Sequence, residues 1–110
     1  MDYGLKKETI EKLNSVFIQF PEIDAAILYG SRAKGNYRIG SDIDLTLKGE
    51  KLTNSALNSI SIKIDDLLLP YMVDISILTQ ISNPDLVEHI ERVGKVFYER
   101  SKATPALSSL

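Results

Sequence analysis

The chain contains no cysteine, and it has a single histidine among its 110 residues. Without cysteine it can form neither a disulfide framework nor a thiolate zinc site. No apolar run approaches the ~20 residues that a membrane-spanning helix needs, and the first residues lack the apolar core of a signal peptide. We therefore expect a cytoplasmic protein with no membrane contact.

The chain also lacks an excess of basic residues, since 13 Lys and Arg face 15 Asp and Glu and the net charge is −2. Proteins that bind long nucleic acid draw much of their affinity from Lys and Arg on phosphates, so we do not expect that function. The length and the 44% hydrophobic content suit one globular domain. We expect this domain over residues 1–100 and a flexible tail over 101–110.

Hydrophobic periodicity predicts an alternation of helices and strands. The expected helices cover residues 6–20, 53–69 and 84–93, with a short turn helix after the first strand. The expected strands cover residues 24–29, 43–48, 72–78 and 96–98. This order predicts a two-layer α/β domain with helices on one face of a small sheet. The local pattern leaves open whether the first two strands run parallel or antiparallel.

Asp42 and Asp44 are the first candidates for chemistry. Residues two apart on a strand point to the same face, roughly 6.6 Å apart along the backbone, while Ile43 and Leu45 would point into the core. Neighbouring carboxylates repel each other unless positive charge lies between them, and Mg²⁺ often takes one or two carboxylates together with substrate phosphates. For this short motif alone, a solvated strand end stays the alternative.

A glycine turn precedes these acids, with residues 32–41 between the two features. Gly30 has access to backbone angles barred to other residues, and Ser31 supplies a hydroxyl and can cap a helix. Amides at a helix start bind phosphate, and Arg32 and Lys34 add positive charge. A plain strand-to-helix turn is the alternative. The turn and the acids in this order favour a site for a metal-bound nucleoside triphosphate.

Three other motifs are excluded. A P-loop requires Gly-Lys followed by Ser or Thr, but residues 35–37 read Gly-Asn-Tyr. A dinucleotide fingerprint is broken by the Gly-Ser-Arg of residues 30–32. An EF-hand that began at Asp42 would need glycine at its sixth position and glutamate at its twelfth, where this chain has Leu47 and Thr53.

The runs GSRAKG and GSDIDL together resemble the signature of the DNA polymerase β-like nucleotidyltransferase superfamily. They are similar in particular to its smallest members, the minimal nucleotidyltransferases (MNT) encoded beside HEPN-domain partner proteins. The resemblance covers most of the chain and implies a mixed sheet. It also implies a third carboxylate on a later strand, for which Asp74, between Val73 and Ile75, is the candidate.

By this resemblance Gly30, Ser31 and Arg32 would bind the triphosphate. Lys34 is a further candidate because its charge lies in the same few residues. Ser41 either caps the following strand or touches a phosphate.

The resemblance further implies that Asp42, Asp44 and Asp74 bind metal, expected as two Mg²⁺ ions, and activate the acceptor. The expected reaction moves a nucleoside monophosphate, AMP from ATP, to a hydroxyl. The expected partner is a separate helical HEPN-like protein, and adenylylation of that partner would make this chain an antitoxin. The alternatives are a catalytically weak nucleotide-binding or partner-neutralising module and a small-molecule nucleotidyltransferase of the aminoglycoside type.

Two expectations concern residues outside the signature. His89 lies between acidic residues, so we expect it on a solvated helix face without a catalytic role. We expect the partner to dock at Ile62, which lies off the apolar stripe of its helix, or at Leu107 and Leu110 of the tail.

Overall fold

The computed structural model describes residues 2–100, which form helices and strands in the expected order. The helices are α1 (Lys7–Phe17), α2 (Ser31–Lys34), α3 (Asn54–Asp65) and α4 (Pro84–Val93), with a short 3₁₀ turn, η1 (Leu78–Gln80). The strands are β1 (Ala25–Tyr29), β2 (Ile43–Lys48), β3 (Val73–Ile77) and β4 (Lys95–Glu99). The tail expected over residues 101–110, with Leu107 and Leu110, lies outside the described residues.

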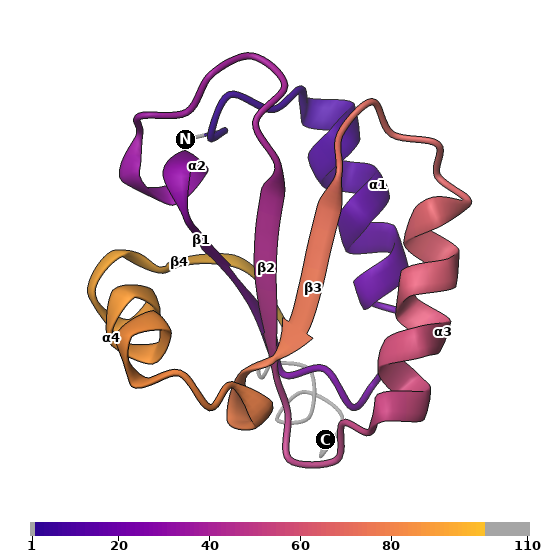
Figure 1. The fold of residues 1–110 in the computed structure, drawn as a ribbon. Coiled ribbons are helices and arrows are strands. Elements are labelled where there is room, and N and C mark those ends of the chain that lie inside the picture. Colours follow the sequence, from indigo (N-terminus) through magenta and orange to yellow (C-terminus); the bar gives the residue numbers. More distant parts are fainter. Residues whose placement is uncertain (1, 101–110) are drawn as a thin grey trace, which may run out of the picture.

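The four strands form one sheet in the order β3-β2-β1-β4 (Figure 1). β1 pairs antiparallel with both β2 and β4, whereas β2 and β3 run parallel. The predicted mixed sheet is therefore confirmed, and the direction of the first two strands, left open by the local pattern, is antiparallel. Because β2 and β3 are parallel and in register, residues that start both strands lie at the same end of the sheet.

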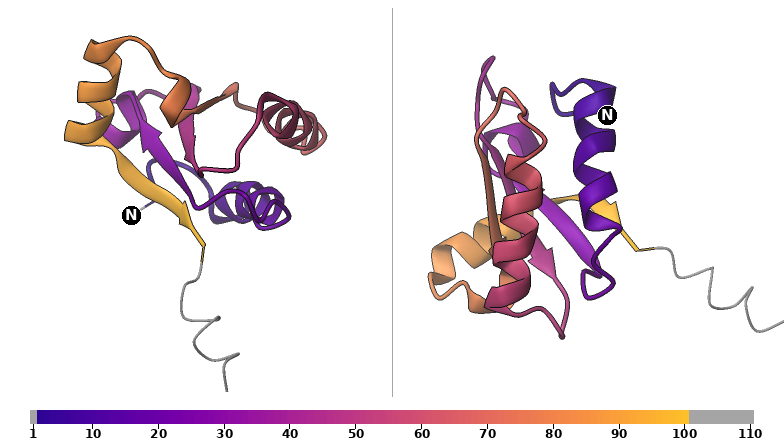
Figure 2. Two further views of the ribbon diagram at one scale, coloured as in Figure 1. Left: turned by 90° about the horizontal axis from the view of Figure 1, so that it is seen from below. Right: turned by 90° about the vertical axis from the view of Figure 1, so that its right-hand side faces the viewer.

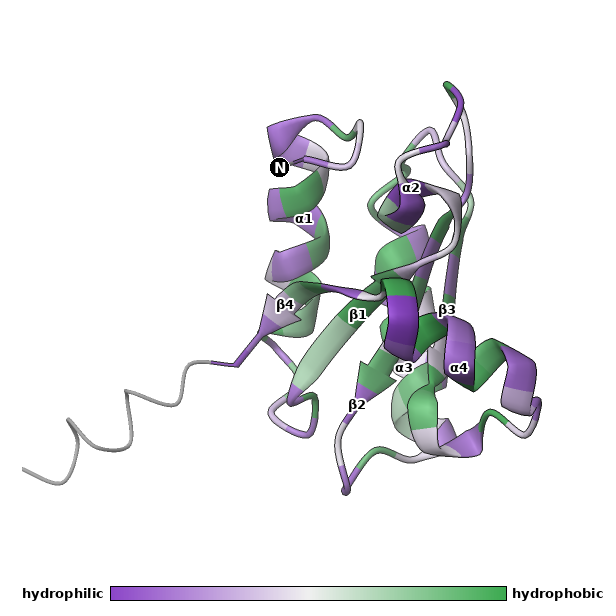
Figure 3. Ribbon diagram, turned by 90° about the vertical axis from the view of Figure 1, so that its left-hand side faces the viewer, coloured by the Kyte–Doolittle hydropathy of each residue, from purple (hydrophilic) through white to green (hydrophobic). Residues whose placement is uncertain are grey.

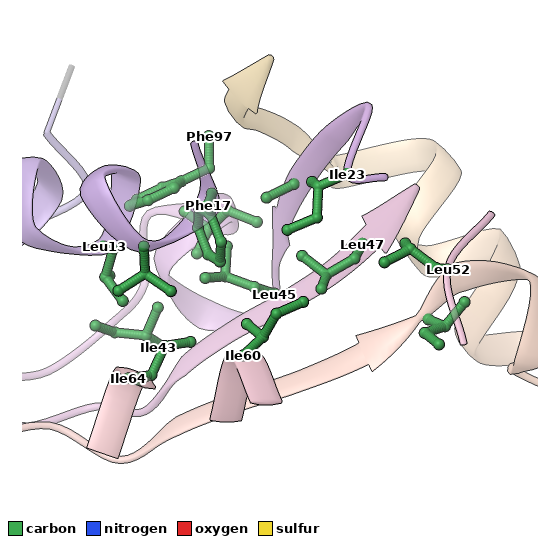
Figure 4. Packing of buried hydrophobic residues seen from close by; sticks show 14 of the residues in the cluster. Leu13, Phe17, Ile23, Ile43, Leu45, Leu47, Leu52, Ile60, Ile64 and Phe97 are labelled. Carbon is green, nitrogen blue, oxygen red and sulfur yellow. The ribbon is translucent and has the colours of Figure 1, made fainter. Parts of the chain in front are cut away.

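The main core lies between the sheet and the two long helices α1 and α3. Figure 4 shows Leu13 and Phe17 of α1 and Ile60 of α3 directed at the side chains of β2. All three are fully buried, and each such side chain contributes about 1.5–3 kcal/mol to folding. The strand residues that face this core are the apolar partners in the alternating pattern: Leu28, Ile43, Leu45 and Leu47.

Helix α4 differs from the other long helices because it packs against the opposite face of the sheet. Figure 2 shows α4 on one side of the strands and α1 and α3 on the other. A side chain on Gly94 would come 2.8 Å from Cγ2 of Ile27, the neighbour of core-facing Leu28 on β1. The expectation of helices on one face thus holds for α1 and α3 and is corrected for α4, which packs against β1 on the other face.

The helix ends follow the expected capping chemistry with one difference. The side chain of Asn83 accepts hydrogen bonds from the amides of Asp85 and Leu86, and Thr53 caps α3 in the same way. Helix α3, expected to reach residue 69, ends at Asp65. Leu68 has φ +54°, a left-handed conformation that ends the helix before the proline.

Hydropathy follows this layering. Apolar colour runs through β1 and β2, whereas α1 and α4 alternate between apolar and polar residues along their length (Figure 3). Such alternation is typical of helices with one buried face. Within residues 2–100, every helix is too short or too polar to cross a bilayer.

Candidate functional site

The sheet places the three predicted aspartates on one face at one end. Asp44 and Asp74 are register partners on the parallel strands β2 and β3, and Tyr29 is the partner of Asp44 on β1. Asp42 immediately precedes β2, two residues before Asp44. Asp42 and Asp74 are exposed, while Asp44 is half-buried. Side chains at directly paired positions are close neighbours, so two strands distant in sequence bring their carboxylates together.

The three aspartates give this face an excess of negative charge, which shifts the pKa values of two side chains. Burial, followed by the charges of Asp74 and Asp42, raises the pKa of Asp44, and His89 acts in the opposite direction. Burial and the two carboxylates of Asp74 and Asp44 likewise raise the pKa of Tyr29. In the described part of the chain, the ion pairs are Lys7–Glu11 and Arg92–Glu88, and neither involves these aspartates.

Gly30 forms the turn directly above Asp44. Its backbone has φ +76° and ψ −156°, a conformation that residues with a side chain rarely adopt. A Cβ atom at this position would collide with Oδ2 of Asp44. Glycine is therefore required both by backbone conformation and by the close approach of the carboxylate.

Ser31 begins helix α2 with its hydrogen-bond donors available. Its carbonyl accepts the amides of Gly35 and Asn36. Across residues 2–100, the amide and the hydroxyl of Ser31 have no hydrogen-bond partner in the protein. These are the donors that the predicted phosphate-binding role requires.

The amide of Gly30, in contrast, is occupied. It donates to Nε2 of His89, at 3.1 Å, from across 59 positions of sequence. The expectation that His89 lies on a solvated face is therefore wrong: the acidic neighbours face solvent, and Glu88 pairs with Arg92 at 3.0 Å. Helical spacing could have predicted this position of His89. The residue lies three positions after Leu86 and beside buried Ile90, which puts it at the edge of the apolar stripe.

Arg32 is also placed differently from its predicted role. Its side chain is 2% exposed. Nε and Nη2 donate to the carbonyl of Ser41 at 3.1 and 2.9 Å, and Nη1 donates to the carbonyl of Tyr3 at 2.8 Å. The guanidinium lies 5.2 Å and 5.1 Å from the ring centroids of Tyr37 and Tyr71. Since three of its five N–H donors are used, Arg32 holds the loop before Asp42 instead of pointing freely at a ligand.

The remaining two candidates lie beside this loop. Ser41 accepts the amide of Arg38 on its hydroxyl, at 2.8 Å, and so closes the turn that leads to Asp42. Lys34 is exposed and lines a depression of ≈ 390 Å³ together with Tyr3, Tyr37 and Lys95. The three aspartates are not among the residues that line this depression.

The donor set fits a divalent cation that is shared with a substrate. Within residues 2–100, no three acidic or histidine side chains are grouped as a finished metal cage. Mg²⁺ does not need such a cage, because it binds through one or two carboxylates plus substrate phosphates and water. Asp42, Asp44 and Asp74 are hard oxygen donors, and Asp42 and Asp74 raise the pKa of Asp44 by repulsion. Neither ion pair found in residues 2–100 neutralises them, and a divalent ion would relieve this repulsion.

A larger depression of ≈ 470 Å³ lies elsewhere, lined by Pro21, Glu22, Asp24, Glu50, Lys51 and Arg100. These residues flank the far ends of β1 and β2 and include none of the signature residues. Size alone would favour this depression, but the chemistry of the side chains favours the aspartate face.

Comparisons with solved structures identify proteins of the same fold. A toxin–antitoxin crystal structure with AMP-PNP superposes with a TM-score of 0.65 at 23% identity, over 96% of this chain and 82% of that one. An MNT antitoxin from Shewanella oneidensis, in complex with its tri-AMPylated HEPN toxin, has a TM-score of 0.63 at 19% identity over 94% and 79%. A nucleotidyltransferase described from Sulfolobus solfataricus has a TM-score of 0.53 at 22% identity over 90% and 94%.

Sequence comparison gives the family. A search of curated proteins finds no match. The family model described as "Polymerase beta, Nucleotidyltransferase" matches residues 11–103, a span that contains the glycine turn, all three aspartates and every strand. The chain therefore belongs to the polymerase β nucleotidyltransferase family.

Proposed function

We propose that this chain transfers a nucleoside monophosphate, AMP from ATP, to a hydroxyl on a separate protein with the help of Mg²⁺. The single observation that carries the proposal is the aspartate face: Asp44 and Asp74 are paired across β2 and β3, Asp42 adjoins them, and the Gly30 turn contacts Asp44. The reaction class, nucleotidyl transfer, follows from the polymerase β nucleotidyltransferase family to which the chain belongs.

Asp42 and Asp44 would bind the cation that the triphosphate carries, expected as one of a pair of Mg²⁺ ions. When bound, such ions neutralise phosphate charge and activate the attacking oxygen. Asp74 lies on the neighbouring strand, at the exposed edge of the sheet. This position supports a role for Asp74 on the acceptor side, where its carboxylate would orient the hydroxyl and accept its proton.

The glycine turn would bind the leaving phosphates. The amide and hydroxyl of Ser31 have no acceptor within residues 2–100 and are free to donate to phosphate oxygens. Transfer of this kind depends mainly on positioning and charge neutralisation, so fixed donors at the leaving group stabilise the transition state. Lys34 would add a screened positive charge nearby, and Arg32 and Ser41 would keep the loop before Asp42 in place.

The acceptor is proposed to be a helical HEPN-like protein, which would make this chain an antitoxin. Two similar structures support this: one is a toxin–antitoxin complex with AMP-PNP, and the other holds a tri-AMPylated HEPN toxin with an MNT antitoxin. The elements from Lys7 to Glu99 all belong to one sheet and its covering helices. Residues 2–100 therefore form no second domain that could bind an acceptor, and we propose that another protein supplies the acceptor hydroxyl.

The test compares the wild-type protein with the double variant Asp42→Asn, Asp44→Asn. We expect wild type to bind ATP only with Mg²⁺ and to label a co-expressed partner from ATP, and we expect the folded double variant to do neither. Chelation of the metal should have the same effect as the substitutions. Undiminished Mg²⁺-dependent binding by the folded double variant would refute the proposal.

Asp74→Asn separates the roles. Because Asp74 is assigned to the acceptor, this variant should bind Mg²⁺ and ATP nearly as wild type does and fail in transfer. A wild-type protein that binds ATP and its partner but never labels it would instead favour the neutralising module. Efficient transfer to an aminoglycoside by the isolated chain would favour the small-molecule enzyme.

A further inference from the structure

Histidine 89 lies on the aspartate face although no sequence motif points to it. It is half-buried on α4, and its Nε2 accepts the amide hydrogen of Gly30 at 3.1 Å. An Nε2 that accepts is unprotonated, so the ring carries its hydrogen on Nδ1. The imidazole also meets the edge of the Tyr29 ring, with centroids 6.2 Å apart and planes at 82°. Both neighbours of the imidazole therefore belong to the segment that leads into the phosphate-binding turn.

Helix α4 is held in a way that fixes this histidine. Its first turn is capped by Asn83 and begins with proline. Its last turn is pressed against β1, because Gly94 approaches Ile27 too closely for any side chain. Ile90, the residue after His89, is 5% exposed. With both ends of the helix anchored, the imidazole has little freedom to leave Gly30.

The bond to His89 decides which donors the turn presents. Gly30 has φ +76°, and its amide would otherwise be a half-buried donor without a partner, which is costly. With that amide satisfied by the imidazole, the next donors along the chain are the amide and hydroxyl of Ser31. Holding donors in the bound geometry before the ligand arrives increases affinity, because less order must be created on binding.

We propose that His89 is a positioning residue for the triphosphate: it holds the Gly30 amide, and through it orients Ser31 toward the phosphates. This inference rests on the proposed function, which supplies the triphosphate. His89 itself is not assigned contact with the substrate or with the metal.

Two variants of similar size separate positioning from packing. His89→Gln places an amide oxygen near the position of Nε2 and keeps an acceptor for Gly30. His89→Leu fills the space and has no acceptor. The probe is inorganic triphosphate with Mg²⁺, because it has phosphates but no base or sugar, and unfolding temperatures are measured alongside. A second set of titrations uses ATP.

We expect His89→Leu to bind inorganic triphosphate about tenfold more weakly than wild type, which corresponds to about 1.4 kcal/mol. We expect His89→Gln to stay within about threefold of wild type, since it restores the acceptor. The same split should appear in KM for ATP, with the smaller change in kcat. Equal affinities for all three proteins, or equal losses in both variants, would overturn the inference.

Amide hydrogen exchange of Gly30 gives a readout without nucleotide. The amide should exchange slowly in wild type and His89→Gln, and at least tenfold faster in His89→Leu, while the amides of α1 keep their protection. Unchanged exchange at Gly30 would overturn the inference even if affinity falls. If wild type binds neither ATP nor triphosphate while Gly30 is protected as expected, the proposed function fails and the role in phosphate binding fails with it, and the bond from Gly30 to His89 is only structural.

Discussion

Individual residues on the aspartate face are constrained by backbone and charge at once. Gly30 must adopt a positive φ and must also leave room for the carboxylate of Asp44. Gly35 has φ +89° but open space where a Cβ would lie. The two glycines therefore share the backbone requirement and differ in the contact with the site.

Gly30→Ala and Gly35→Ala should consequently separate strain from function. Gly35→Ala should lose about 1–2 kcal/mol of stability, the cost of an alanine in the left-handed helical region. Gly30→Ala should lose about 1–3 kcal/mol, because φ +76° with ψ −156° is a region almost restricted to glycine. Only Gly30→Ala should also lose binding of ATP with Mg²⁺, because its methyl group displaces Asp44. Denaturant unfolding and ATP titration measure the two effects. Normal ATP binding by folded Gly30→Ala would show that the turn is only a connector.

Asp44 should weaken the folded state at neutral pH in the absence of metal. Its pKa is raised from the ordinary value of 3.8 by burial and by two carboxylates, so the folded protein binds this proton more tightly than the unfolded chain does. The sign follows from linkage: stability is present below the unfolded pKa and is lost as pH rises through the raised folded pKa.

Asp44→Asn should therefore have a higher unfolding temperature than wild type at pH 7 without divalent ions. The difference should shrink as pH falls through the raised pKa of folded Asp44 and should be lost below 3.8. Asp24→Asn, at an exposed position away from the site, is the control. A fall in the stability of Asp44→Asn at pH 7 would contradict the repulsion described above.

Arg32 should matter more for the loop than for the ligand. Arg32→Lys keeps the charge but cannot reach the carbonyls of Ser41 and Tyr3 together, because lysine lacks the planar fork. Each hydrogen bond to a charged group contributes about 1.5–3 kcal/mol to stability. Because water and the lysine ammonium replace part of the lost bonds, we expect the free energy of unfolding to fall by about 2–4 kcal/mol. Thermal unfolding measures it, with exposed Lys34→Gln as the control. If Arg32→Lys is as stable as wild type, the bonds of Arg32 to the loop are unimportant and its predicted role as a phosphate ligand is favoured again.

At the scale of elements, α3 and α4 have similar caps and different positions. Thr53 caps α3, which covers the core face, and Asn83 caps α4, which lies on the aspartate face with His89. Loss of either cap removes a partner for the first amides of the helix. The consequences for binding should differ because only α4 contacts the glycine turn.

Thr53→Ala and Asn83→Ala should each cost about 1 kcal/mol of stability. Asn83→Ala should in addition weaken ATP binding by roughly two- to fivefold, since a frayed α4 holds His89 less firmly, while Thr53→Ala should leave it unchanged. Unfolding curves and ATP titrations of the two variants decide this. Equal binding by both would mean that the start of α4 has no part in the site.

At the scale of the whole molecule, the fold leaves the aspartate face open on the side of β3, an edge strand. Asp74 lies on that strand and is exposed, so an acceptor hydroxyl from another protein can approach it. Ile62, the residue expected to dock, is 61% exposed on α3, and its helix covers the opposite face of the sheet. The residue expected to contact the partner and the carboxylate proposed for the acceptor are thus on different surfaces.

Co-expression with the product of the adjacent reading frame should give a stable complex on size-exclusion chromatography. Ile62→Glu should weaken this complex without affecting ATP binding, because Ile62 is remote from the aspartates. Ile18→Glu is the control, because Ile18 is 71% exposed at the C-cap of α1, the other helix on the core face. Labelling of the partner from ATP should fall together with the complex. An intact complex with Ile62→Glu would move the docking surface elsewhere.

The sequence alone was sufficient for features that depend on neighbours along the chain. Alternation located β2 within its observed bounds, and helical periodicity located α4 as Pro84–Val93. The Gly-Ser turn, the paired aspartates and Asp74 on an apolar strand indicated the family that the sequence comparison then identified. These signals are local, because caps, strand periodicity and left-handed turns involve contacts over a few residues.

The tertiary structure alone decided which groups meet across the chain. Register between β2 and β3 brought Asp74 beside Asp44. Packing of α4 on β1 brought His89 to Gly30 from 59 positions away. The carbonyls of Ser41 and Tyr3 accept three of the five N–H donors of Arg32, which the sequence suggested for phosphate. No periodicity encodes such encounters, because each depends on the faces that two distant elements present after the core has formed. The sequence therefore provided the carboxylates and the turn as candidates, and packing decided which groups the histidine and the arginine contact.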